Sequence, residues 1–81
     1  MDGTYDRQTL EPVQFEDGYQ VGLRDPRKIP SFYETYLGVW QGKLELSIWV
    51  KRWDTAVVLA VREGQSHVWD WAKGVAREVK P

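Results

Sequence analysis

No cysteine occurs in this chain of 81 residues, so neither a disulfide nor a thiolate-bound metal can support its fold. A domain of this length buries only roughly 60% of the surface that its unfolded chain exposes. The core must therefore be small, and contact with a partner or with a second copy would add useful burial. Hydrophobic residues make up 42% of the chain and charged residues 28%, which is typical of a folded domain.

Charge and hydropathy argue against membranes and against long stretches of nucleic acid. Eleven Lys and Arg residues face twelve Asp and Glu residues, so the chain lacks the basic body of a phosphate-backbone binder. The N-terminus has no basic region followed by an apolar run, and the longest apolar run, Ala56 to Val61, is too short to cross a bilayer. These two features predict a soluble, cytoplasmic chain, and the lack of cysteine agrees with a reducing compartment.

Alternating apolar residues predict strands in the first half of the chain. Residues 1–12 are polar and are expected to form a flexible N-terminal arm. Val13 to Phe15 and Tyr19 to Leu23 flank an Asp-Gly turn signal and predict a β-hairpin. A third strand is expected over residues 36–40. A fourth is expected over residues 44–50, where every second residue is aliphatic.

The second half of the chain allows two interpretations. In the favoured one, Asp54 is the N-cap of a helix from Thr55 to Glu63, and Gly64 follows its end. A hairpin of two strands, over residues 67–71 and 75–79, comes next.

In the other interpretation, the β-branched residues of 55–62 form a strand and residues 66–79 form a terminal helix. Both interpretations give a single α+β domain over residues 13–81. We expect a small antiparallel sheet of four to five strands with one or two short helices.

No catalytic motif is visible. His67 is the sole histidine and forms H-x-x-D with Asp70. On a strand these two side chains would point to opposite faces, so the carboxylate could not orient the imidazole as a general base needs. The glycines fit neither a phosphate-binding loop nor a nucleophile elbow, and the acidic residues lack calcium-loop spacing. We therefore predict no catalytic residue, no metal and no cofactor, and we do not expect an enzyme.

One candidate protein-binding surface is the group Trp49, Lys51, Arg52 and Trp53. If the aliphatic residues of 44–50 face the core, Trp49 points to the other side of that strand, and Lys51 shares its face. Trp and Arg dominate binding hot spots. The alternative is that Trp49 packs under the N-terminal arm or against a second copy of the chain.

A second candidate surface is the loop segment from Arg24 to Tyr36. Arg24, Arg27 and Lys28 lie close in sequence to Tyr33 and Tyr36. Basic side chains with aromatic neighbours can bind the phosphates and bases of a nucleic acid or nucleotide. The alternative is a solvated loop whose aromatic residues cover one edge of the core.

The stretch from Ala56 to Gly74, AVVLAVREGQSHVWDWAKG, combines a short helix that ends in E-G-Q with a W-D-W-A-x-G hairpin. It resembles short uncharacterised proteins of bacterial phages and other mobile elements. The resemblance covers about a quarter of the chain and implies an α+β accessory protein. It carries no functional residues over to this chain.

Small size, five tryptophans and balanced charge favour a non-enzymatic accessory protein of phage or mobile-element type. We expect it to bind a protein partner, as an inhibitor or adaptor, or to form a homodimer. One alternative is a nucleic-acid or nucleotide-binding module that uses the Arg24 to Tyr36 segment. Another is an enzyme whose site is not visible in the sequence.

Overall fold

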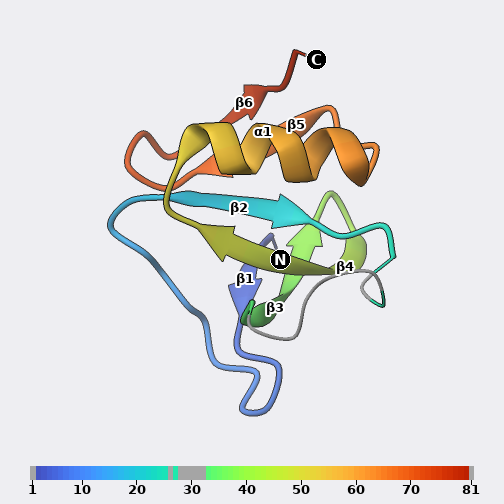
Figure 1. The fold of residues 1–81 in the computed structure, drawn as a ribbon. Coiled ribbons are helices and arrows are strands. Elements are labelled where there is room, and N and C mark those ends of the chain that lie inside the picture. The colour runs from blue at the N-terminus through green and yellow to red at the C-terminus, as the bar shows by residue number, and fades with distance from the viewer. Residues whose placement is uncertain (1, 26, 28–32, 81) are drawn as a thin grey trace.

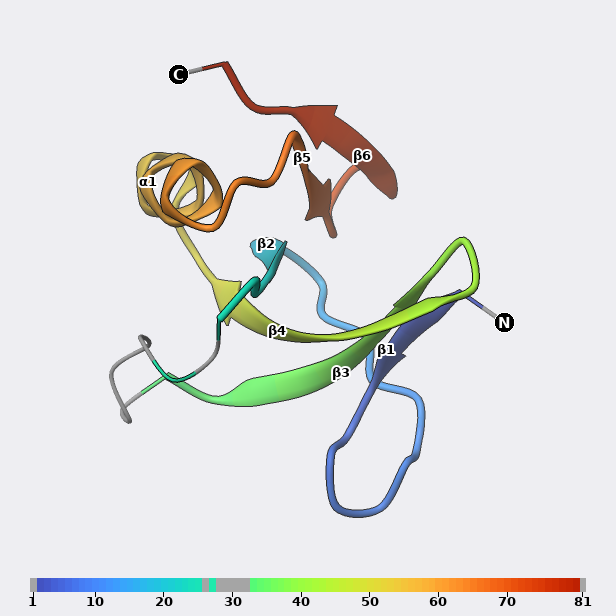
Figure 2. The same ribbon diagram turned by 90° about the vertical axis from the view of Figure 1, so that its right-hand side faces the viewer.

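The structure is a computed structural model that describes residues 2–25, 27 and 33–80. Within these residues the chain forms six strands and one helix, which are β1 (Gly3–Tyr5), β2 (Tyr19–Gly22), β3 (Thr35–Trp40), β4 (Lys43–Val50), α1 (Trp53–Arg62), β5 (His67–Asp70) and β6 (Val75–Glu78). The strands make one antiparallel sheet in the order β1-β3-β4-β2-β5-β6. The sheet curls into a half-barrel, and α1 lies against its outer side (Figure 1, Figure 2).

The pairing register gives the middle of the sheet two different faces. Gln20 on β2 lies opposite both Trp49 on β4 and Trp69 on β5, whereas Val21 lies opposite Ile48. Directly opposite residues project to the same face, and neighbours along a strand project to opposite faces. The Val21–Ile48 pair therefore points toward α1, and the row of Gln20 with the two tryptophans points away from it.

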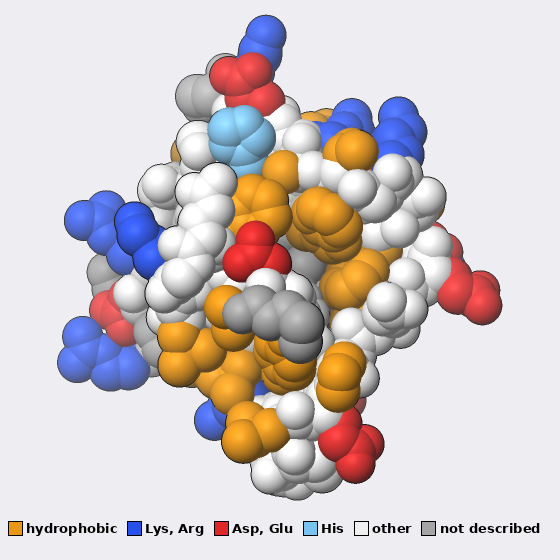
Figure 3. Space-filling model, turned by 180° about the vertical axis from the view of Figure 1, so that it is seen from behind, with side chains coloured by type: hydrophobic (Ala, Val, Ile, Leu, Met, Phe, Trp, Pro, Cys, Tyr) orange, Lys and Arg blue, Asp and Glu red, His pale blue; other side chains and the backbone are white. Residues whose placement is uncertain are grey.

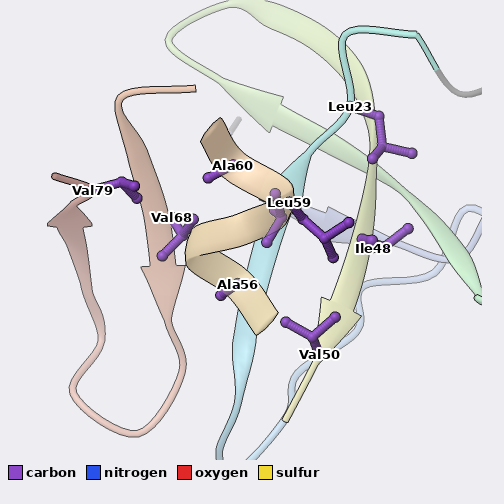
Figure 4. Packing of buried hydrophobic residues seen from close by; sticks show 9 residues of the cluster. Leu23, Ile48, Val50, Ala56, Leu59, Ala60, Val68 and Val79 are labelled. Atoms are coloured by element: carbon purple, nitrogen blue, oxygen red, sulfur yellow. The ribbon is translucent and has the colours of Figure 1, made fainter. Parts of the chain in front are cut away.

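The hydrophobic core lies between α1 and strands β2, β4 and β5 (Figure 4). Ala56 and Ala60 are fully buried, and their small side chains let the helix lie close to the strands. Val79, which follows β6, covers one end of this core (Figure 4). The buried hydrophobic residues are Val21, Leu23, Ile48, Val50, Ala56, Leu59, Ala60, Val68 and Val79.

Helix α1 begins at Trp53, two residues earlier than a cap at Asp54 would allow. Arg52 occupies the cap position in an extended conformation and makes no side-chain cap bond. Asp54 lies inside the first turn, where its carboxylate accepts a hydrogen bond from the Thr55 N–H (2.8 Å) and pairs with the Arg52 guanidinium (2.9 Å). The prediction of Asp54 as the N-cap is therefore wrong. Gly64, at φ +68°, ends the helix as expected.

The prediction of four to five strands was wrong, because the described residues form six strands, with one helix, in a broadly small α+β arrangement. Residues 13–15, predicted as the first strand of a hairpin, form no strand. Strand β2 has β4 on one edge and β5 on the other, so no edge remains for them. The Val13 N–H instead donates to the Thr4 carbonyl at 2.8 Å.

Strand β1 lies within residues 1–12, where a flexible arm was expected. Strand β1 pairs with residues 37–39 of β3. The favoured interpretation of the second half is confirmed, since α1 is followed by the β5–β6 hairpin. In the described part of the chain, no helix is long and apolar enough to span a membrane.

Ile48→Ala is expected to lower the free energy of unfolding by about 2–5 kcal/mol, because it leaves a cavity where a 0% exposed side chain was. Val58→Ala is the control, since Val58 is 67% exposed on α1, and it should change stability by less than about 0.5 kcal/mol. Urea unfolding followed by circular dichroism measures both. Similar small losses in the two variants would contradict this account of the core.

Candidate functional site

Six aromatic side chains gather on the side of the sheet that points away from α1. One comes from the loop before β2, four from strands β3, β4 and β5, and one from the turn after β5. These six residues, called the aromatic face, are Phe15, Tyr36, Trp40, Trp49, Trp69 and Trp71. Figure 3 views the molecule from this side, where hydrophobic side chains gather in the middle of the surface beside an acidic side chain, and the other charged side chains lie farther out.

Phe15 joins three other rings of the aromatic face. Its ring centroid lies 5.1 Å from that of Trp49, and the two planes are nearly parallel at 22°. Its centroid is 5.5 Å from both Tyr36 and Trp71, in edge-on contacts. Such stacked and edge-on pairs are the favoured arrangements of aromatic rings. Phe15 therefore connects the loop before β2 to β3, β4 and the turn after β5.

Trp69 extends the aromatic face toward the tip of the β3–β4 hairpin. Its centroid lies 6.2 Å from Trp71 and 6.3 Å from Trp40. Trp40 ends β3, just before a two-residue turn in which Gln41 and Gly42 both have positive φ, as a tight hairpin turn requires. Trp40 is 47% exposed, so a large part of its indole is open to solvent.

The amide of Gln20 is the polar centre of this face. Its Nε2 donates to the Ser47 hydroxyl at 3.0 Å, and its Oε1 accepts a hydrogen bond from the Trp71 indole at 3.1 Å. The Trp49 indole donates to the backbone carbonyl of Asp17 at 2.8 Å. Gln20 is only 6% exposed, so its own two hydrogen bonds are largely shielded from water and fix the position of Trp71.

The four residues predicted to bind a protein do not form one patch. Trp49 lies on the aromatic face. Lys51 and Arg52 are exposed in the link between β4 and α1, and Arg52 is paired with the carboxylate in the first turn of α1. Trp53 lies on the other side of the sheet, in α1, with the Arg77 guanidinium over its ring. Only Trp49 of this group belongs to the aromatic face.

The residues of the nucleic-acid alternative are also spread out. Arg24 is exposed beside the loop that follows α1. Arg27 is paired with a neighbouring carboxylate at 3.0 Å. Tyr33 packs against the core, whereas Tyr36 lies on the aromatic face. Lys28 lies outside the described residues.

Sequence reasoning missed Phe15, Trp40, Trp69 and Trp71. A signal was present for two of them, since Trp69 and Trp71 lie two residues apart in a predicted strand and so share a face. No local signal could place Phe15, because its neighbours come from β3, β4 and the turn after β5.

His67 and Asp70 lie apart, as their spacing predicted. His67 is exposed, and its Nδ1 lies 2.8 Å from the Ser66 hydroxyl. Asp70 is 3% exposed on the helix side, where it accepts a hydrogen bond from the Lys73 N–H and pairs with Arg77 at 3.4 Å. Its carboxylate therefore stabilises the β5–β6 turn and does not orient the imidazole.

An open depression of about 520 Å³ lies beside the C-terminal end of α1, between Leu23, Leu46 and Glu63. Arg24 and Glu45 also line it, and Glu45 occupies a strand position on the side of the aromatic face. Glu63 is 3% exposed, but its Oε1 already accepts hydrogen bonds from the N–H groups of Arg24 (2.7 Å) and Asp25 (3.0 Å). This carboxylate holds the loop after β2 in place. Among the residues that the structure describes, no group of three His, Cys, Asp or Glu side chains could hold a metal ion.

No family model, no curated protein and no solved structure matches this chain. The resemblance of residues 56–74 to phage and mobile-element proteins therefore stays a prediction.

Gly18→Ala is expected to displace Trp49, because an added Cβ would overlap its indole. Gly74→Ala is the matched control, since both glycines have positive φ but the Cβ at Gly74 would meet no atom within 4 Å. Both variants should lose about 1 kcal/mol of stability from backbone strain. Gly18→Ala should lose at least about 1 kcal/mol more from the overlap.

Urea unfolding of both variants measures this difference. The NMR signal of the Trp49 indole N–H should shift in Gly18→Ala alone. Equal stability losses with an unmoved indole signal would contradict the packing described for Gly18.

Tyr36 is expected to ionise at unusually high pH. Burial, the hydrogen bond that its hydroxyl donates to Glu34 (2.7 Å), and the charges of Glu34 and Asp6 raise the pKa of Tyr36 to about 12. The unfolded value is about 10, so the contribution to stability is complete below pH 10 and is lost as the pH rises toward 12. An ultraviolet pH titration should show a late-ionising tyrosine that disappears in Tyr36→Phe and ionises earlier in Glu34→Gln. An unchanged titration curve in both variants would refute this assignment.

Proposed function

We propose that this chain is a non-catalytic binding module for a protein partner, and that the aromatic face is its interface. The observation that carries the proposal is a fixed set of four tryptophans with Phe15 and Tyr36, presented at the surface of so small a domain. Aromatic side chains are enriched at the centres of protein interfaces and supply much of their binding energy.

The half-exposed Trp40 supports a partner rather than a purely structural role. Its neighbour Trp69 holds it on one side, yet 47% of Trp40 stays in contact with solvent. Large apolar side chains grouped at a surface usually mark an interaction site. The rings already occupy fixed positions, so little side-chain entropy would be lost on binding.

Charge favours a protein over a nucleic acid as the partner. Glu34 is hydrogen-bonded to Tyr36, and Glu45 and Glu78 occupy strand positions on the same side of the sheet as the tryptophans. These carboxylates would repel phosphates. An accessory role in a phage or mobile element is part of the proposal that rests on the resemblance of residues 56–74.

Trp40→Ala is expected to weaken partner binding at least tenfold, since truncating an interface anchor typically costs about 2 kcal/mol. Leu44→Ala is the matched control, because Leu44 lies in the same hairpin, is 68% exposed and points to the other face. Nuclease-treated lysate is passed over the wild type and both variants, and bound proteins are compared by quantitative mass spectrometry.

A protein that is lost with Trp40→Ala and kept with Leu44→Ala supports the proposal. A wild-type homodimer that dissociates only in Trp40→Ala, measured by sedimentation, also supports it. Binding that is the same in all three chains, with a monomeric wild type, would overturn it. Unfolding curves exclude loss of fold as the cause.

A further inference from the structure

The helix side of the molecule shows how this fold holds a cation on a tryptophan. The guanidinium carbon of Arg77 lies 3.9 Å from the centre of the Trp53 ring, and its Nη1 lies 3.4 Å from the Asp70 carboxylate. The face of an indole attracts a cation, and a carboxylate beside it completes the pairing. Arg77 thus has a ring on one side and a carboxylate on another.

The aromatic face has rings and carboxylates, but in the described part of the chain no Lys or Arg makes a cation–π contact with these rings. In that part of the chain, both cation–π contacts belong to Arg77, which lies on the helix side. The exposed half of Trp40 and the neighbouring Trp69 therefore offer indole surface that a cation from outside could cover.

Two carboxylates occupy strand positions on this face. Glu45 pairs with Gly38, which lies between Tyr36 and Trp40 on the same face of β3. Its carboxylate reaches over Gly22, where an added Cβ would overlap it. Glu45 therefore lies over the middle of the sheet rather than at an edge.

The charge of the strand positions on this face is negative. Glu78 on β6 lies opposite His67 on β5. His67 is two residues before Trp69, so Glu78, His67 and Trp69 project to the same side of the sheet. Among the paired strand positions of this face that the structure describes, Lys43, opposite Trp40, is the one Lys or Arg. Tryptophan rings with an excess of carboxylates complement a cationic partner.

We infer that the occupant of the aromatic face is a basic protein segment. Its arginine or lysine side chains lie on the indoles of Trp40 and Trp69 and pair with Glu45 and Glu78. The inference rests on the proposed function, because it names the partner chemistry of the same interface. Lys43 opposes this binding, since its strand position opposite Trp40 is on the same face.

The test uses a decapeptide of alternating Gly and Arg, with a Gly-Glu decapeptide and an oligothymidylate of similar length as comparison ligands. Isothermal titration calorimetry of the full chain should show saturable binding of the Gly-Arg peptide alone, weakened by added salt. Trp40→Ala should reduce its affinity about tenfold, and Glu45→Gln about threefold.

Two further variants separate the effect of charge from loss of folded structure, which could only lower the affinity. Lys43→Glu should raise the affinity for the Gly-Arg peptide about threefold or more, because it reverses the opposing charge. Glu11→Gln, at an exposed carboxylate in the loop between β1 and β2, is the control and should leave the affinity unchanged. Unfolding midpoints confirm that each variant is folded.

Equal binding of the acidic peptide, no binding of the basic one, or an affinity unmoved by Glu45→Gln and Lys43→Glu would each overturn the inference. The proposed function is judged separately. If Trp40→Ala still abolishes capture of a protein while the Gly-Arg peptide fails to bind, the interface stands and only its partner chemistry is wrong. Binding of oligothymidylate alone, with no protein captured, would overturn both.

Discussion

The pairing of β2 along both of its edges is the constraint on which the rest of the structure depends. On one side β4 leads to β3 and β1, and on the other β5 leads to β6. In this short strand Val21 is fully buried under α1, and the adjacent Gln20 is buried on the opposite side. A shift of register by one residue would exchange these two positions. The four residues of β2 therefore determine the positions of both the core and the aromatic face.

Gln20 also explains how a surface made of rings keeps a definite shape. Apolar contacts alone have little directionality, whereas an amide that bonds Ser47 on one strand and Trp71 beyond another fixes distances across the sheet. Below Gln20 the core is aliphatic, and above it the surface is aromatic. The thin sheet thus separates a layer that stabilises the fold from a layer that is available for recognition.

Local patterns in the sequence predicted the elements that depend on local interactions. The alternation of β4, the helix ended by Gly64 and the C-terminal hairpin were all visible in this way. Strand β1 was not, because polar residues 3–5 pair with β3 far along the chain. For the site, alternation in β4 gave the direction of Trp49. Its grouping with Phe15 and Trp71 depends on the β2 pairing, which no local pattern encodes.

Four of the five tryptophans lie on one face, and the fifth, Trp53, lies on the other side beneath Arg77. At ring separations near 6 Å, as between Trp69 and its neighbours, indoles exchange excitation energy and emit as a coupled group. Trp53 instead contacts Tyr19 and Arg77, at the junction of α1, β2 and β6. The molecule therefore carries two natural optical reporters. One follows events at the aromatic face, on the inner side of the half-barrel, and the other follows loosening of the helix from the sheet.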